Sequence, residues 1–182
     1  MLNYMQVLPE KNVSATCNYG VTMNDYKYYL DNGIYDIQDG KFEEAVEKIN
    51  KSIELKNDFE ISYFYRAVAN QALKNYDEAM LDYTKSIQIN PKMTDSYYNM
   101  AEIILTRKDI TNQNIPKAIE YLEKALELDP KFIDALFAMA AAYKKLGNYH
   151  KALEYLEQLL QIEPQAVNAK ALKKLILQKY II

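Results

Sequence analysis

The amino-acid sequence predicts an all-α protein, and three observations support that prediction. The 182 residues include only four glycines and five prolines, which leaves little material for β-hairpin turns. Lys, Glu, Leu, Ala and Ile are abundant, and this composition favours helices. A helical phrase also recurs four times along the chain. We therefore expect helices throughout, arranged as repeats.

Two sets of markers define the repeat. A small residue recurs in the second half of each unit, and a turn residue recurs at its end. Both series have spacings of 34, 39 and 34 residues. A period of ~34 residues is typical of paired helices that stack on their neighbours, and the third unit carries five extra residues, within 108–115. The markers are Ala45, Ala79, Ala118 and Ala152, then Asn57, Pro91, Pro130 and Pro164.

The last unit, residues 133–164, shows the pattern most clearly. Its first helix has large, large, small and aromatic residues at Leu136, Met139, Ala140 and Tyr143, and Gly147 follows. This pattern resembles the tetratricopeptide repeat family, and the resemblance extends over roughly residues 26–166. It implies a right-handed α-α superhelix, or solenoid, of four helix hairpins plus a C-terminal capping helix.

The elements follow in order from this register. Residues 1–25 carry no repeat and form an N-terminal lead-in, with Asn24 or Asp25 as the N-cap of the first helix. The four repeats occupy residues 26–59, 60–93, 94–132 with the five-residue insertion, and 133–166. Residues 167–182 form the capping helix. We expect Ala171, Leu172, Leu175 and Ile176 to face the stack, and Lys170, Lys173 and Lys174 to stay in water.

Small residues are expected where the two helices of a hairpin touch, because antiparallel helices approach closely only when one side of the contact is small. The predicted contacts are Gly33 with Ala45, Ala67 with Ala79, Ala101 with Ala118 and Ala140 with Ala152. Four positions depart from the family pattern: Asn32 and Arg66 replace an apolar residue, and Asp36 and Asn70 replace a tyrosine.

The resemblance also implies a binding surface, because the first helices of such hairpins line a concave groove. Leu30, Phe64, Tyr98 and Phe137 hold equivalent positions there and form a ladder of large apolar groups that suits a peptide anchor. The other interpretation is that superhelical packing, the lead-in or the cap covers these groups. The full predicted groove is Leu30, Ile34, Phe64, Val68, Tyr98, Asn99, Glu102, Phe137, Ala141 and Lys144.

One branch of the family binds the C-terminal carboxylate of a chaperone through lysine, asparagine and arginine side chains in this groove. Of the positions that would form this clamp, only Asn99 matches, and it could still hydrogen-bond a peptide backbone. We therefore expect a different kind of ligand.

Composition and motifs argue against several classes of function. The net charge of −3 and pI of about 5.3 provide no basic field for nucleic acid. The single cysteine, Cys17, and the single histidine, His150, suggest neither a metal site nor a catalytic relay, and we expect no cofactor. No apolar run is long enough to enter a membrane, so a cytoplasmic protein is expected.

These observations predict a non-catalytic adaptor or scaffold that binds an extended or helical segment of a protein partner in the apolar groove. The identity of the partner is not encoded in the repeat. The alternative is a self-associating, homo-oligomeric protein whose groove holds its own N-terminal or C-terminal segment, since residues 1–8 and Ile181–Ile182 are largely apolar. A third hypothesis is a platform for a small enzymatic or nucleic-acid site.

Overall fold

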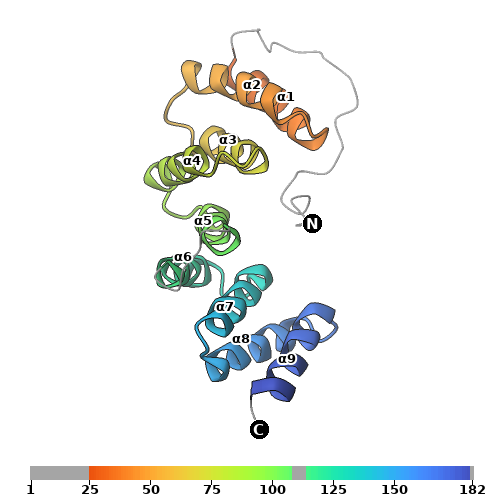
Figure 1. Cartoon of the computed structure of the whole chain (residues 1–182). Coiled ribbons are helices and arrows are strands. Elements are labelled where there is room, and N and C mark those ends of the chain that lie inside the picture. The colour runs from red at the N-terminus through yellow and green to blue at the C-terminus, as the bar shows by residue number, and fades with distance from the viewer. Residues whose placement is uncertain (1–24, 108–113, 181–182) are drawn as a thin grey trace. The chain divides into compact units, whose positions relative to one another are not determined.

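The computed structural model describes residues 25–107 and 114–180. These residues form nine α-helices and no strand, which confirms the prediction of an all-α helical repeat protein (Figure 1). The helices are α1 (Tyr26–Gln38), α2 (Phe42–Leu55), α3 (Glu60–Ala72), α4 (Tyr76–Ile89), α5 (Thr94–Thr106), α6 (Ile115–Leu128), α7 (Ile133–Lys145), α8 (Tyr149–Ile162) and α9 (Val167–Tyr180).

The chain divides into two compact units, between Ala79 and Met80 inside α4. In unit 1, α2 packs against both α1 and α3. In unit 2, α5 packs on α6, α6 on α7, α7 on α8 and α8 on α9, so each helix contacts the next one along the chain (Figure 1). We call α1, α3, α5 and α7 first helices, and α2, α4, α6 and α8 second helices. A junction is the contact between a second helix and the helix that follows it.

The hairpin of α1 and α2 depends on a glycine. A Cβ atom at Gly33 would lie 2.5 Å from Cγ1 of Ile49 and 3.2 Å from the carbonyl oxygen of Ala45. Both of those residues are fully buried in α2. In unit 2, Ala101, Ala118, Ala140 and Ala152 are likewise fully buried, as expected for small residues between paired helices.

Small residues also occupy the junctions. Oγ of Ser52 lies 2.9 Å from Oγ of Ser62 between α2 and α3, and Oγ of Ser86 lies 2.6 Å from Oγ of Ser96 between α4 and α5. All four side chains are fully buried, and each pair satisfies its own hydroxyl groups. The next junction has Ala125 and Ala135 at the equivalent positions, both fully buried. Close approach therefore recurs between hairpins as well as within them.

The helix ends follow the sequence signals. Asp25 caps α1 by accepting a hydrogen bond of 2.9 Å from the backbone N–H of Lys27. Gly40 and Gly147 end the first helices of their hairpins with φ of +76°, a conformation that glycine adopts without strain. Lys74 holds the equivalent position after α3 with φ of 65°, where a side chain is less favourable.

Polar partners explain the four departures from the family pattern. Oδ1 of Asn70 accepts a hydrogen bond from Nδ2 of Asn75 at 3.5 Å. Nδ2 of Asn32 donates to the Tyr28 carbonyl oxygen at 2.6 Å. Nη1 of Arg66 donates to Oδ1 of Asn50 at 2.7 Å. The buried carboxylate of Asp36 lies against the ammonium of Lys48, an ion pair rather than an aligned hydrogen bond. Each unexpected polar group thus has compensation.

The last helix corrects one expectation. Ala169 and Ile176 are buried and Leu172 is half-buried, so the face of α9 that packs on α8 follows an i, i+3, i+7 pattern. Ala171 and Leu175, which we expected to face the stack, are exposed because they lie on the other side of the helix. Lys170 and Lys174 are exposed as expected, and Nζ of Lys173 donates to Oε1 of Glu157 at 3.0 Å.

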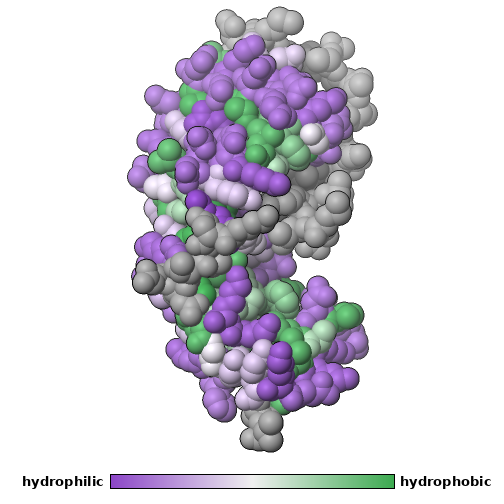
Figure 2. All heavy atoms as spheres, viewed as in Figure 1, coloured by the Kyte–Doolittle hydropathy of each residue, from purple (hydrophilic) through white to green (hydrophobic). Residues whose placement is uncertain are grey.

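Several predicted features lie outside the described residues: the lead-in before Asp25, with Cys17, most of the five-residue insertion, and Ile181–Ile182. Within the described ranges, none of the helices has the length and apolar character needed to span a bilayer. On the face shown in Figure 2, hydrophilic residues predominate and hydrophobic residues reach the surface in separate patches.

The close contact at Gly33 yields a test. Gly33→Ala should destabilise the protein by about 1–3 kcal/mol, because overpacking outweighs the better helix propensity of alanine. Ile49→Ala removes the obstructing Cγ1 atom, so the double variant should lose less stability than the two single changes added together. Urea unfolding followed by circular dichroism measures all three. Additive losses would show that Gly33 and Ile49 do not compete for space.

Candidate peptide-binding surfaces

In unit 1, the predicted groove residues lie on α1 and α3, which contact each other. Leu30, Phe64 and Val68 are buried, with 4%, 5% and 8% of their surface exposed, and Ile34 is half-buried. The ring of Phe64 packs edge-on against that of Tyr65 at 5.2 Å between centroids. In this unit the predicted anchors thus serve mainly as packing groups.

In unit 2, the predicted residues lie on α5 and α7, which also contact each other. Tyr98 and Phe137 hold equivalent positions on these helices, and both are half-buried. Ala141 and Lys144 continue the same face of α7 and are half-buried too. We call Tyr98, Phe137, Ala141 and Lys144 the first-helix surface of unit 2.

Two predicted residues of α5 are more deeply buried than the residues of this surface. Asn99 and Glu102 keep only 8% and 7% of their surface exposed. Glu102 lies four residues after Tyr98, at the position equivalent to Ala141, and so shares the face of Tyr98, whereas Asn99 lies on the adjacent face of α5. A peptide-binding role for Asn99 stays a prediction.

Charges mark the ends of the first-helix surface. Asp95 and Asp134 lie three residues before Tyr98 and Phe137 and hence on the same helix faces. Burial raises the pKa of each carboxyl group, and a neighbouring acid, Asp129 or Glu163 respectively, raises it further. At the other end, Nζ of Lys145 donates to the Leu105 carbonyl oxygen at 2.7 Å and connects α7 to α5.

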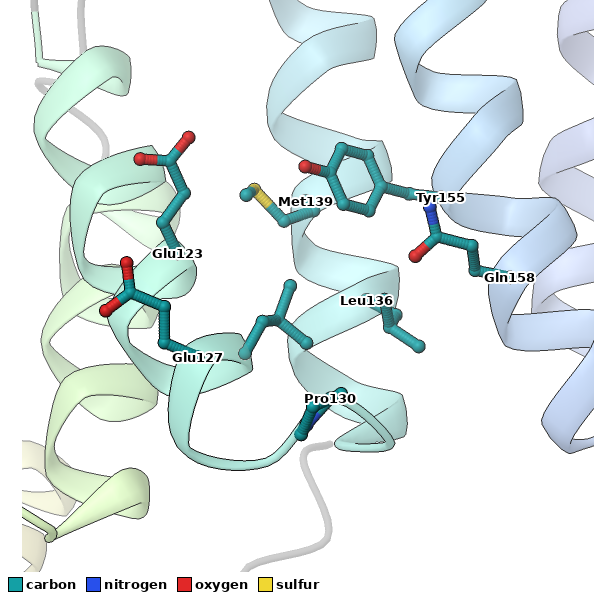
Figure 3. Close-up of a pocket in the computed structure, with 8 residues that line it drawn as sticks. Glu123, Glu127, Pro130, Leu136, Met139, Tyr155 and Gln158 are labelled. Atoms are coloured by element: carbon teal, nitrogen blue, oxygen red, sulfur yellow. The ribbon is translucent and has the colours of Figure 1, made fainter.

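A pocket of about 390 Å³ lies between α6 and α8, with α7 behind it. Figure 3 shows Glu123 and Glu127 on the α6 side and Tyr155 and Gln158 on the α8 side. Leu126, Pro130, Leu136 and Met139 supply its apolar lining. The sequence reasoning missed this pocket, although comparing Leu136 with the tyrosines one and two repeats earlier could have indicated it.

Tyr155 connects the pocket wall to a stack of tyrosines. Its ring lies parallel to that of Tyr143, with 5.7 Å between centroids. Burial raises the pKa of the Tyr155 hydroxyl, and the nearby Tyr143 and Glu123 add to the effect. The ring therefore presents a neutral, rigid wall to the pocket at physiological pH.

The described residues contain no group of three or more His, Cys, Asp or Glu side chains placed to hold a metal ion. His150 is exposed in the first turn of α8, as expected for a residue at the start of a second helix.

Comparison with protein families gives two matches. Models described as tetratricopeptide repeat match residues 61–93 and 109–176, together more than half of the chain.

Three relatives have similar sequences. Human tetratricopeptide repeat protein 12 is 28% identical over 93 residues, which are 51% of this chain and 12% of that protein. A TPR repeat-containing protein of Methanocaldococcus jannaschii is 33% identical over 105 residues, 58% of this chain and 16% of that protein. An uncharacterized protein of the same archaeon is 33% identical over 73 residues, 40% of this chain and 85% of that protein. The chain thus matches a small part of the first two.

Solved structures share the fold. A crystal structure of MamA has a TM-score of 0.71 and 23% identity, covering 80% of this chain and 82% of that one. MamA from Desulfovibrio magneticus has a TM-score of 0.75 and 17% identity, covering 88% of each chain. The pilF protein of Pseudomonas aeruginosa has a TM-score of 0.74 and 17% identity, covering 85% and 68%.

The acidic pairs beside the first-helix surface can be tested by titration. Glu163→Gln should lower the pKa of Asp134, because it removes a neighbouring negative charge, yet leave it above the ordinary value because burial remains. Because the pKa of Asp134 is raised in the folded state, its ionised carboxylate opposes folding at higher pH. This penalty is relieved as the pH falls through the folded-state pKa. Carbon-detected NMR titration measures the pKa, with Asp95 as an internal control. An unchanged pKa of Asp134 in the Glu163→Gln variant would exclude an electrostatic coupling to Glu163.

Proposed function

The chain belongs to the tetratricopeptide repeat family, and on that basis we propose that it is a non-catalytic adaptor that binds a segment of another protein. Stacked hairpins of this kind present extended surfaces for polypeptides. We place the binding site on the first-helix surface of unit 2 and propose a protein or peptide partner rather than nucleic acid. A cytoplasmic location remains part of the proposal.

The observation that carries this proposal is the pair Tyr98 and Phe137. These rings occupy equivalent positions on two helices in contact, and both are partly accessible. The ring of Tyr98 packs against that of Phe132, at 5.1 Å between centroids. Large aromatic groups held rigidly at the centre of a surface commonly contribute most of the binding free energy.

The polar groups around these rings support a peptide ligand. Asp134 lies at the N-terminal end of α7, and Lys144 and Lys145 lie in its last turn. A segment running along α5 and α7 would meet apolar rings at the centre and opposite charges at the two ends. Such an arrangement selects the direction and register of a ligand more than its affinity.

The burial of Leu30 and Phe64 limits the proposal to unit 2. In unit 1 these two side chains contribute to packing, which is the other interpretation that the sequence left open. Self-association through the terminal segments remains the alternative. Those segments lie outside the described residues. Light scattering on a chain without residues 1–20 distinguishes the two proposals: a fall in the number of chains per particle would favour self-association.

The proposal predicts the effect of removing both rings. In a pull-down from native lysate, the double variant Tyr98→Ala, Phe137→Ala should capture at least about tenfold less partner protein than the wild type, as expected when two central anchors are removed. Quantitative mass spectrometry measures the captured protein, and circular dichroism checks that the variant is folded.

Tyr35→Ala is the matched control, because Tyr35 is an exposed tyrosine on a first helix outside the predicted groove. It should leave capture unchanged. Equal capture by the wild type and the double variant would contradict the proposed location of the site.

A further inference from the structure

The pocket between α6 and α8 can be compared with the same place in the other repeats, because the spacing of 34, 39 and 34 residues defines equivalent positions. Two positions matter most. One lies on the second helix, at Asn50, Thr84, Glu123 and Glu157. The other lies on the following helix, at Arg66, Met100, Met139 and Lys173.

At two junctions a cation spans these positions. In the first, Nη1 of Arg66 donates to Oδ1 of Asn50 at 2.7 Å, and its guanidinium lies 5.6 Å from the centroid of the Tyr63 ring. In the fourth, Nζ of Lys173 donates to Oε1 of Glu157 at 3.0 Å. At both junctions, an oxygen atom on the second helix thus accepts a hydrogen bond from a basic side chain on the following helix.

The second junction needs no cation. Its residues are Thr84 and Met100, which carry no charge. Oγ1 of Thr84 donates to the Met80 carbonyl oxygen within its own helix, at 2.7 Å. At the first and fourth junctions the basic side chain thus has an oxygen acceptor on the second helix, and at the second junction neither position is charged.

The third junction departs from this pattern, because it has an acidic residue without a basic one. Glu123 supplies a carboxylate, but Met139 stands where a cation would be needed. Within residues 25–107 and 114–180, the exposed side chain of Glu123 makes no hydrogen bond and no ion pair. The nearby Lys124 is engaged with Glu127, at 2.6 Å between Nζ and Oε2. The carboxylate of Glu123, at the rim of the pocket, is thus accessible to a cation of a ligand.

The third junction also lacks a ring. Tyr63 and Tyr97 are replaced by Leu136. In the first junction the hydroxyl of Tyr63 donates to the Asn57 carbonyl oxygen at 3.1 Å, and Asn57 is equivalent to Pro130, which lines the pocket. The pocket therefore occupies the space that a tyrosine ring fills elsewhere, and its volume falls in the range of small-ligand sites.

We propose that this pocket binds an arginine side chain from a protein partner. The guanidinium pairs with Glu123, the aliphatic stem lies on the accessible side chains of Leu126 and Pro130, and the planar group lies toward the ring of Tyr155. The first junction shows the same chemistry within one chain, with Arg66 between an oxygen acceptor and a tyrosine ring. Arginine suits such a site better than lysine, because its planar group can pair and stack at once.

This binding site is separate from the first-helix surface, since it lies between two second helices and contains neither Tyr98 nor Phe137. The inference therefore does not depend on the proposed function. It assigns the protein a second contact, selective for one positively charged side chain of a ligand.

The test uses N-acetyl-arginine amide and N-acetyl-citrulline amide, which have nearly the same shape but differ in charge. NMR titration of the whole chain should show weak, saturable binding of the arginine probe, with shifts centred on the pocket residues of α6, α7 and α8. The citrulline probe should bind about five- to tenfold more weakly, because the charge-assisted hydrogen bond to Glu123 is lost.

Glu123→Gln should weaken the arginine probe by the same factor. Glu43→Gln changes the net charge equally on an exposed position of α2 and should have no effect. Leu136→Tyr should abolish binding by filling the pocket as Tyr63 and Tyr97 do; if that variant does not fold, the two glutamine variants decide. Equal binding of both probes, an unaffected Glu123→Gln variant, or no localised shifts would each overturn the proposal.

Discussion

The close approach of paired helices at small residues is the constraint on which the rest of this structure depends. At Gly33 there is no room for a Cβ atom beside Ile49, and the hairpins of unit 2 have fully buried alanines at the equivalent positions. Because two helices in such contact cannot slide past each other without a clash, the register of each hairpin is determined. The buried serine pairs extend this register to the junctions.

A determined register makes side chains comparable from one repeat to the next. Polar residues that look out of place in the sequence acquire partners at the junctions, as Arg66 does with Asn50 and Lys173 with Glu157. Burial of such groups would otherwise be unfavourable. The pocket beside Glu123 stands out against this background, because there a repeat provides a carboxylate and a space but neither the cation nor the ring. Features of binding can thus arise from a departure from internal symmetry rather than from an added motif.

Much of the fold could be predicted because its signals are local or periodic: the alanine spacing, the cap at Asp25 and the glycine at 147 each depend on a few neighbouring residues. Burial of Leu30 and Phe64 depends on neighbouring helices, so periodicity alone could not separate anchors from packing groups. The predicted orientation of α9 was wrong at Ala171 and Leu175, because two faces of that helix carry apolar residues and only one of them packs on α8. The pocket was missed because it arises where Leu136 replaces the tyrosine found at the equivalent position in two other repeats.

The central claim is that equivalent positions in the repeats carry interchangeable interactions, and a double-mutant cycle tests it most directly. Met139→Lys would place at the third junction the lysine that the fourth junction has at Lys173. Urea unfolding of Met139→Lys, Glu123→Gln and the double variant measures the coupling between the two positions. The account predicts a favourable coupling of about 0.5–1 kcal/mol, because the Glu123 end of the new ion pair is exposed to solvent. A lysine at position 139 with the same effect on stability beside Glu123 and beside glutamine would contradict it.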